Sequence, residues 1–142
     1  MAENQYKATV EYAGNEFLIA SGYNGHAQTI DFKGERHAAP SPLEMLLISV
    51  AACTAADVIS ILTKKRQDVT DYRVEITGER KEDHPKAFIK FHVHHIVHGR
   101  SVSEKAVADA VHLSDTKYCS VAATVRPTAE ITTSFELIEV SS

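Results

Sequence analysis

The stretch SPLEMLLISVAACTAADVISILTKK, residues 41–65, decides the fold of this chain. Ser41 and Glu44 have the spacing of a capping box, and Pro42 suits the first position of a helix. The basic residues at the end of the stretch favour the negative, C-terminal end of a helix dipole. We therefore expect a helix from Pro42 to about Lys65.

Apolar side chains cover most of the circumference of this helix, and a helix of that kind is usually buried. The run is also long enough to span a membrane. Against a span, Asp57 would lie near the middle of the bilayer, where a charge is costly. We expect a central helix inside a soluble fold, with no membrane partner. Its apolar residues are Leu43, Leu46, Leu47, Val50, Ala51, Ala55, Val58, Ile59 and Leu62.

Length and composition indicate one ordinary globular domain, residues 1–142. The net charge is −4 and the pI is about 6.0, so no basic surface argues for a nucleic-acid partner. The first residues, MAENQYKATVEY, lack the charged and apolar regions of a secretory signal. Two cysteines do not make a disulfide framework, which favours a cytoplasmic protein.

Alternating segments on both sides of the central helix predict strands, so the fold class is α+β. Before the helix, strands are expected over residues 5–12, 16–20 and 28–32. After it, residues 72–80 and 88–98 form an antiparallel hairpin, and residues 129–140 form the last strand. Ser101 and Glu104 repeat the capping-box spacing and open a helix that ends near Leu113. A shorter helix is expected over residues 118–123.

Cys53 and Cys119 are the only thiols, and they are the candidate reactive groups. Cys119 is expected in the first turn of the short helix, where backbone N–H groups and Lys117 favour a thiolate. Cys53 lies inside the central helix with Asp57 one turn on, and both features favour the protonated thiol. Each cysteine is alternatively a small buried hydrophobe. A thiol redox site requires that the two lie together.

The histidines do not predict a metal site. His92 and His94 share one face of a strand with His98, whereas His95 points to the other face. No CxxC or HExxH motif occurs, and zinc needs ligands that converge. We expect a solvated strand face, no metal and no cofactor. His37 is the histidine that lies in the loop just before the central helix.

Two motifs together resemble a known family. The segment SPLEMLLISVAACTAADV, followed much later by KYCSVAATV, is similar to the paired cysteine motifs of the OsmC/Ohr proteins, the osmotically inducible and organic hydroperoxide resistance family. The segments DVISILTKKRQDVTDY, GER and LSDTKYCSVA resemble the YhfA-like branch. The resemblance covers nearly the whole chain, in matching order.

The resemblance implies an OsmC-like fold, with antiparallel sheets wrapped around long central helices in an intertwined homodimer. It also implies a peroxidase used in the response to oxidative stress. Cys53 would attack an organic hydroperoxide to form a sulfenic acid, and Cys119 would resolve it as a disulfide. An external dithiol reductant protein would then regenerate the thiols, without a cofactor.

The chain departs from the family pattern at two positions. The arginine that usually precedes the phenylalanine of the pre-helix strand matches Asp31. The glutamate that usually lies ten residues before the first cysteine matches Leu43. Arg36 and Glu44 are the candidate polarising partners that would act from shifted positions.

Three functions follow as hypotheses. The first is a thiol-dependent peroxidase that reduces organic hydroperoxides through Cys53 and Cys119. The second is a non-catalytic protein of the same fold that binds a small apolar ligand in the dimer cleft, which the loss of the arginine favours. The third is a redox switch, in which disulfide formation changes the binding of a partner.

Overall fold

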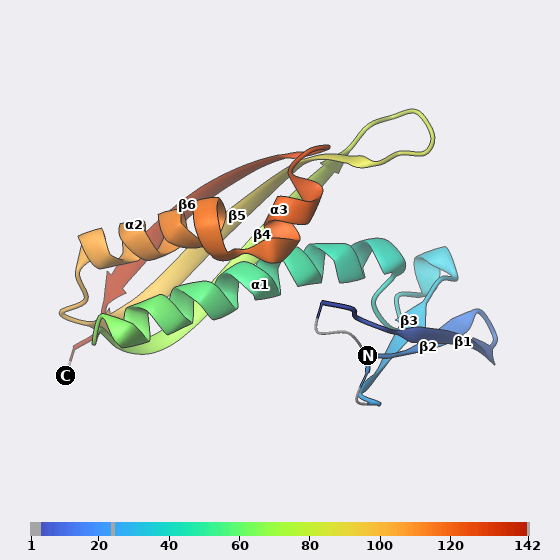
Figure 1. The fold of residues 1–142 in the computed structure, drawn as a ribbon, viewed down its shortest axis with the longest axis horizontal. Coiled ribbons are helices and arrows are strands. Elements are labelled where there is room, and N and C mark those ends of the chain that lie inside the picture. Colours follow the sequence, from blue (N-terminus) through green and yellow to red (C-terminus); the bar gives the residue numbers. More distant parts are fainter. Residues whose placement is uncertain (1–3, 24, 142) are drawn as a thin grey trace. The chain divides into compact units, whose positions relative to one another are not determined.

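Figure 1 shows the chain as a computed structural model that describes residues 4–23 and 25–141. The chain forms two compact units, Met1–Leu46 and Leu47–Ser142. Helices and sheets are both present, so the α+β prediction is confirmed. That residues 1–142 form a single domain stays a prediction.

The first unit is a three-stranded antiparallel sheet in the order β1-β2-β3. Its strands are β1 (Thr9–Gly14), β2 (Phe17–Ser21) and β3 (Ala27–Asp31). The three predicted strands are present, although β1 begins at Thr9 rather than at residue 5. Gly14 joins β1 to β2 with a φ of 88°, a left-handed conformation that glycine adopts without a Cβ clash. A short 3₁₀ turn, η1 (Gly34–Arg36), follows the sheet.

Helix α1 (Pro42–Lys64) begins and ends as the sequence predicts, within one residue. The predicted capping box forms at its start. The Glu44 amide donates to Ser41 Oγ at 3.1 Å, and the Ser41 amide donates to Glu44 Oε1 at 3.4 Å. These two bonds satisfy backbone donors that the first turn of a helix leaves unpaired.

The second unit contains a sheet in the order β4-β5-β6. Its strands are β4 (Asp68–Arg80), β5 (Phe88–Arg100) and β6 (Glu130–Glu139). The expectation of antiparallel pairing is correct for β4 and β5, but β6 pairs with β5 in parallel. The reason is the helical connection between β5 and β6, which returns the chain to the sheet in its original direction.

That connection consists of α2 (Glu104–Leu113), a π-helical turn η2 (Ser114–Tyr118) and α3 (Ser120–Val125). Ser103, not Ser101, caps α2, because Ser103 Oγ accepts a hydrogen bond of 3.2 Å from the Ala106 amide. The Ser101 amide instead donates to the carboxylate of Glu139.

The core of the second unit lies between the sheet and the helices, which cover one face of it (Figure 1). Its buried residues come from α1, β5 and α2, and they are Val58, Leu62, Val97, Ala106, Val107, Ala110 and Val111.

One stripe of α1 is buried and another is not. The buried stripe is Val50, Thr54, Val58 and Leu62. A second stripe, Ile48, Ala52, Ala56 and Ile59, is exposed in this single chain. The expectation that α1 is buried on all sides is therefore wrong for one chain, because one sheet covers one face of a helix.

By length and composition α1 would suffice to cross a membrane, since an 18-residue window has a mean hydropathy of 2.2. In the structure, 28% of that window is buried.

Candidate functional site

Helix α1 places Cys53, a candidate site residue, and Asp57 on one face. Cys53 and Asp57 are four residues apart, so they lie one above the other along the helix. Both are half-buried, because they border the stripe that packs against the core. One face of α1 therefore carries both a thiol and a carboxylate.

Cys119 lies where the helical connection changes direction. The π-helical turn ends when the Cys119 amide bonds the Ser114 carbonyl at 2.9 Å. Cys119 itself is extended, with φ −76° and ψ 101°, and it forms the N-cap of α3. Its Sγ accepts a hydrogen bond of 3.3 Å from the Ala122 amide. The sequence predicted Cys119 inside the first turn, whereas it occupies the cap.

The fold brings the two cysteines together, as the redox hypothesis requires. Both are free thiols, and Cys119 is only 4% exposed. One sulfur from each cysteine and one carboxylate oxygen of Asp57 all lie within 4.8 Å of one another. Side chains 66 positions apart in the sequence therefore form one cluster, the thiol–carboxylate cluster of Cys53, Asp57 and Cys119.

The environment of Cys119 disfavours its thiolate. Burial raises the pKa of Cys119 to about 11, and the neighbouring Cys53 and Asp57 act in the same direction. The Ala122 amide opposes them, but its effect is smaller than that of burial. The local expectation that Cys119 is an acidic thiol is therefore wrong. Lys117, which was expected to help, lies over the ring of Tyr118, 5.2 Å from its centroid.

A buried hydroxyl pair supports the carboxylate of the cluster. Ser114 Oγ lies 2.8 Å from Asp57 Oδ2 and 2.9 Å from Thr54 Oγ1. A hydroxyl has one proton, so Ser114 donates to the carboxylate and accepts from Thr54. Ser114 is completely buried. The sequence did not predict that either hydroxyl would support Asp57, because the Ser114–Asp57 contact joins residues 57 positions apart.

Arg36 is paired inside the first unit. Its Nε and one terminal nitrogen each lie 2.8 Å from an oxygen of Asp31, and its guanidinium lies 3.8 Å from the centroid of the Phe17 ring. The Arg36 hydrogen bonds, assisted by the amides of Lys33 and Ala38, outweigh burial and hold the pKa of Asp31 well below its usual range. Asp31, which matches the position of the family's arginine, is thus the partner of an arginine five residues later.

Glu44, the other candidate polarising partner, is engaged in the capping box with Ser41. Leu43, at the position of the family's glutamate, is 38% exposed in the first turn of α1. Whether Arg36 or Glu44 polarises Cys53 stays a prediction.

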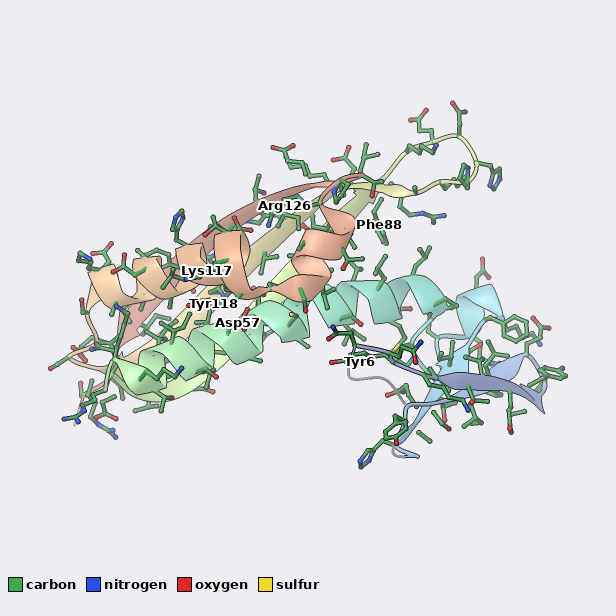
Figure 2. The ribbon with its side chains drawn as sticks, in the orientation of Figure 1. Tyr6, Asp57, Phe88, Lys117, Tyr118 and Arg126 are labelled. Carbon is green, nitrogen blue, oxygen red and sulfur yellow. The ribbon has the colours of Figure 1, made fainter. Side chains whose placement is uncertain are left out.

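Two cavities in the second unit adjoin the thiol–carboxylate cluster. One, of about 450 Å³, reaches Cys119 and is also lined by Lys117 and Arg126. The other, of about 400 Å³, reaches Asp57 and is also lined by Tyr118 (Figure 2). Arg126 is paired with Asp115 at 2.8 Å. The remaining lining residues of the second cavity are Ser60, Ile61, Lys64, Lys65 and Leu113.

The histidines of β5 divide between the two faces of the sheet, as the alternation predicted. His95 is fully buried on the helix-covered face. His92 and His94 are half-buried on the other face, where both bond the Ser134 hydroxyl on β6, at 2.9 and 2.7 Å. Among residues 4–23 and 25–141, none of these histidines joins a group of three ligating side chains.

Comparison with known proteins identifies the family. The model of the OsmC-like protein family matches residues 33–134. Protein YhfA of Escherichia coli strain K12 is 41% identical over 133 residues, which are 93% of this chain and 98% of that protein.

The chain belongs to the OsmC-like family. Among solved structures, a hypothetical protein from Aquifex aeolicus VF5 is 31% identical with a TM-score of 0.85, over 96% of this chain and 98% of that one. An organic hydroperoxide resistance protein OsmC from Legionella pneumophila is 15% identical with a TM-score of 0.67, over 96% and 99%. The second likeness concerns the fold alone. The recognition of this family from the two cysteine motifs is confirmed, and so is the OsmC-like fold.

Proposed function

We propose that this OsmC-like protein is a thiol-dependent peroxidase that reduces organic hydroperoxides through Cys53 and Cys119, in the defence against oxidative stress. The observation that carries the proposal is the closeness of the two free thiols within the second unit. The organic hydroperoxide resistance described for the Legionella protein of the same fold adds support. An attacking thiol and a neighbouring resolving thiol are what a two-cysteine peroxidase needs.

The chemistry proceeds in three steps. The Cys53 thiolate attacks the terminal oxygen of the hydroperoxide, an S–O bond forms, the O–O bond breaks, and the alkoxide leaves as an alcohol after taking a proton. The Cys119 sulfur then attacks the sulfenic acid, an S–S bond forms, and water leaves. An external dithiol protein reduces the disulfide by two exchange reactions and restores both thiols. No cofactor is required.

Asp57 is the group that we assign as acceptor of the Cys53 proton during the attack on the hydroperoxide, although its negative charge disfavours a standing thiolate. A carboxylate oxygen of Asp57 lies within 4.8 Å of both sulfurs, and Ser114 donates to Asp57 Oδ2 at 2.8 Å. A base within reach of a nucleophile is a common way to activate a thiol that no cation stabilises. Arg36 and Glu44 remain the alternative activating pair.

Steady-state reduction of cumene hydroperoxide with a dithiol tests the proposal. We expect turnover by the wild type and none above the uncatalysed rate for Cys53→Ser, because serine is a far weaker nucleophile than a thiolate. Cys119→Ser, treated with hydroperoxide without dithiol, should form the sulfenic acid on Cys53, and a second molecule of hydroperoxide should convert it to the sulfinic acid, detectable by mass spectrometry, because the resolving thiol is absent. Equal rates for the wild type and Cys53→Ser would refute the peroxidase.

We also propose that the protein is a cytoplasmic homodimer. The exposed stripe Ile48, Ala52, Ala56 and Ile59 of α1 repeats at helical spacing and is apolar throughout. Contiguous apolar surface of this kind marks an interaction site. A second copy offers a matching apolar stripe, since a two-fold interface uses the same surface on both subunits.

A second candidate function is the binding of a small apolar ligand without turnover. The cavity beside Asp57 favours it, because Ile61, Leu113 and Tyr118 give it an apolar wall. Native mass spectrometry that finds a bound apolar molecule beside two reduced cysteines would support this function, whereas ready formation of the Cys53–Cys119 disulfide by peroxide would count against it. If the disulfide forms but turnover stays slow, a redox switch that alters partner binding is the better description.

A further inference from the structure

We infer that Cys53, Asp57 and Cys119 form, in the reduced protein, a binding site for a thiophilic divalent cation such as Zn²⁺. The site is made by α1 and by the cap of α3, which the fold brings together in the second unit. The inference does not depend on turnover of a peroxide, because it concerns the two thiols before any oxidation.

The spacing of the three ligands suits a small tetrahedral ion. Two sulfurs at about 2.3 Å from a tetrahedral zinc are about 3.8 Å apart. The ligating atoms of Cys53, Asp57 and Cys119 already lie within 4.8 Å of one another. Small side-chain rotations therefore suffice to bring the three ligating atoms to the spacing of a tetrahedral site.

The ligand types select the class of metal. Thiolate sulfur is a soft ligand that favours zinc and its heavier relatives, whereas Mg²⁺ and Ca²⁺ take oxygen ligands. Two sulfurs and one carboxylate also bring three negative charges to a divalent ion once both thiols lose their protons, which zinc binding requires. The sequence predicted no metal here because the two thiols are far apart along the chain and form no CxxC motif.

The carboxylate is already oriented for this role. Ser114 donates to Asp57 Oδ2, and Thr54 in turn supports Ser114. A carboxylate has two oxygens, so the other oxygen of Asp57 stays available to an ion. Hydrogen bonds of this kind fix the direction of metal ligands, and their loss typically weakens binding 10- to 100-fold.

Three protein ligands leave a fourth position open, as in catalytic rather than structural zinc sites. The cavities of about 450 and 400 Å³ that reach Cys119 and Asp57 supply space for an ion to enter and for a water molecule in that position.

The test uses the full-length protein, reduced and stripped of metal with a chelator. Zn²⁺ is titrated in competition with a chromogenic chelator, and the zinc-loaded protein is studied by X-ray absorption. We expect one ion per chain with two sulfur neighbours at about 2.3 Å and oxygen neighbours at about 2.0–2.2 Å. No binding, or a shell of ring nitrogens without sulfur, would overturn the inference, and the latter would direct attention to His92 and His94.

Variants sharpen the assignment. Cys53→Ser, Cys119→Ser and Asp57→Asn should each weaken zinc binding, and Ser114→Ala should weaken it about tenfold through the orientation of Asp57. Asp109→Asn is the matched control, because this aspartate pairs with Lys105 outside the cluster and lines neither cavity, and it should bind as the wild type does. Wild-type affinity in Asp57→Asn would remove the carboxylate from the site. The X-ray absorption spectrum of the zinc-loaded wild type shows whether sulfur atoms bind the ion, even if a variant fails to fold.

Peroxidase turnover is measured separately, in the presence of a chelator. A protein that binds zinc through both thiols but does not reduce peroxide would uphold this inference and refute the peroxidase.

Discussion

His95 is a titratable side chain with no exposed surface, and its surroundings decide its charge. Tyr72 of β4 shares a hydrogen bond of 2.6 Å with His95 Nδ1. The other ring nitrogen of His95, Nε2, has no hydrogen-bond partner among residues 4–23 and 25–141. Burial lowers the pKa of His95 to about 4, the adjacent His94 acts in the same direction, and Asp115 on η2 opposes them. The imidazole is therefore neutral in the folded protein at neutral pH.

The first prediction concerns the pH dependence of stability. The unfolded chain binds a proton at His95 below pH 6.5, whereas the folded chain does so only near pH 4. The free energy of unfolding should therefore fall as the pH drops from 6.5 to 4, by at most about 3.5 kcal/mol at about 1.4 kcal/mol per pKa unit. Urea titrations at pH 7.5 and 4.5 measure this change. In His95→Leu the part of the pH-dependent fall in the free energy of unfolding that His95 causes should disappear. In the exposed control His112→Gln that part of the fall should persist. Parallel curves for the wild type and His95→Leu would contradict the prediction.

The second prediction concerns Arg36. Asp31 is 4% exposed and depends on the Arg36 guanidinium for its charge. Arg36→Met should lower the urea midpoint of unfolding, because it leaves a carboxylate without its ion-pair partner. The double variant Arg36→Met with Asp31→Asn should recover part of the loss. An unchanged midpoint in Arg36→Met would show that the pair does not contribute to stability.

At the scale of elements, the start of α2 shows which of two serines caps the helix. Ser101 has the capping-box spacing with Glu104, but Ser103 holds the bond to the Ala106 amide. Ser103→Ala should lower the free energy of unfolding by about 1 kcal/mol, because the first turn loses an acceptor. Ser101→Ala should cost less, since Ser101 contributes its backbone amide to Glu139. Equal losses in the two variants, measured by urea unfolding, would contradict the assignment of the cap.

At the scale of the whole molecule, the exposed stripe of α1 predicts the oligomeric state. Ile48 and Ile59 are 47% and 38% exposed and lie three turns apart on the same face. We expect a dimer in sedimentation velocity, and Ile48→Asp or Ile59→Asp should shift it toward monomer, because a charge enters an apolar interface. Ile138→Asp is the control, since Ile138 on β6 is 39% exposed but lies outside α1. A wild-type monomer, or equal dissociation in Ile138→Asp, would contradict the dimer.

The predictions from sequence succeeded where a few neighbouring residues decide the structure. The capping box of Ser41 and Glu44, the bounds of α1 and the alternation on β5 depend on contacts within a turn or a strand. Among the expectations that failed, two about secondary structure show how distant parts of the chain decide the outcome. The direction of β6 depends on the connection before it, and the cap of α2 depends on how Ser101 meets Glu139.

The candidate site shows the same division. The sequence by itself determined that Cys53 lies on a long apolar helix, that Cys119 lies beside a short one, and that the two motifs belong to the OsmC-like family. Only the tertiary structure decided that the thiols meet at Asp57, that Ser114 supports this carboxylate, and that Cys119 is a weakly acidic thiol. The physical reason is that burial and through-space charge depend on packing between residues far apart in the chain, which a local motif does not contain.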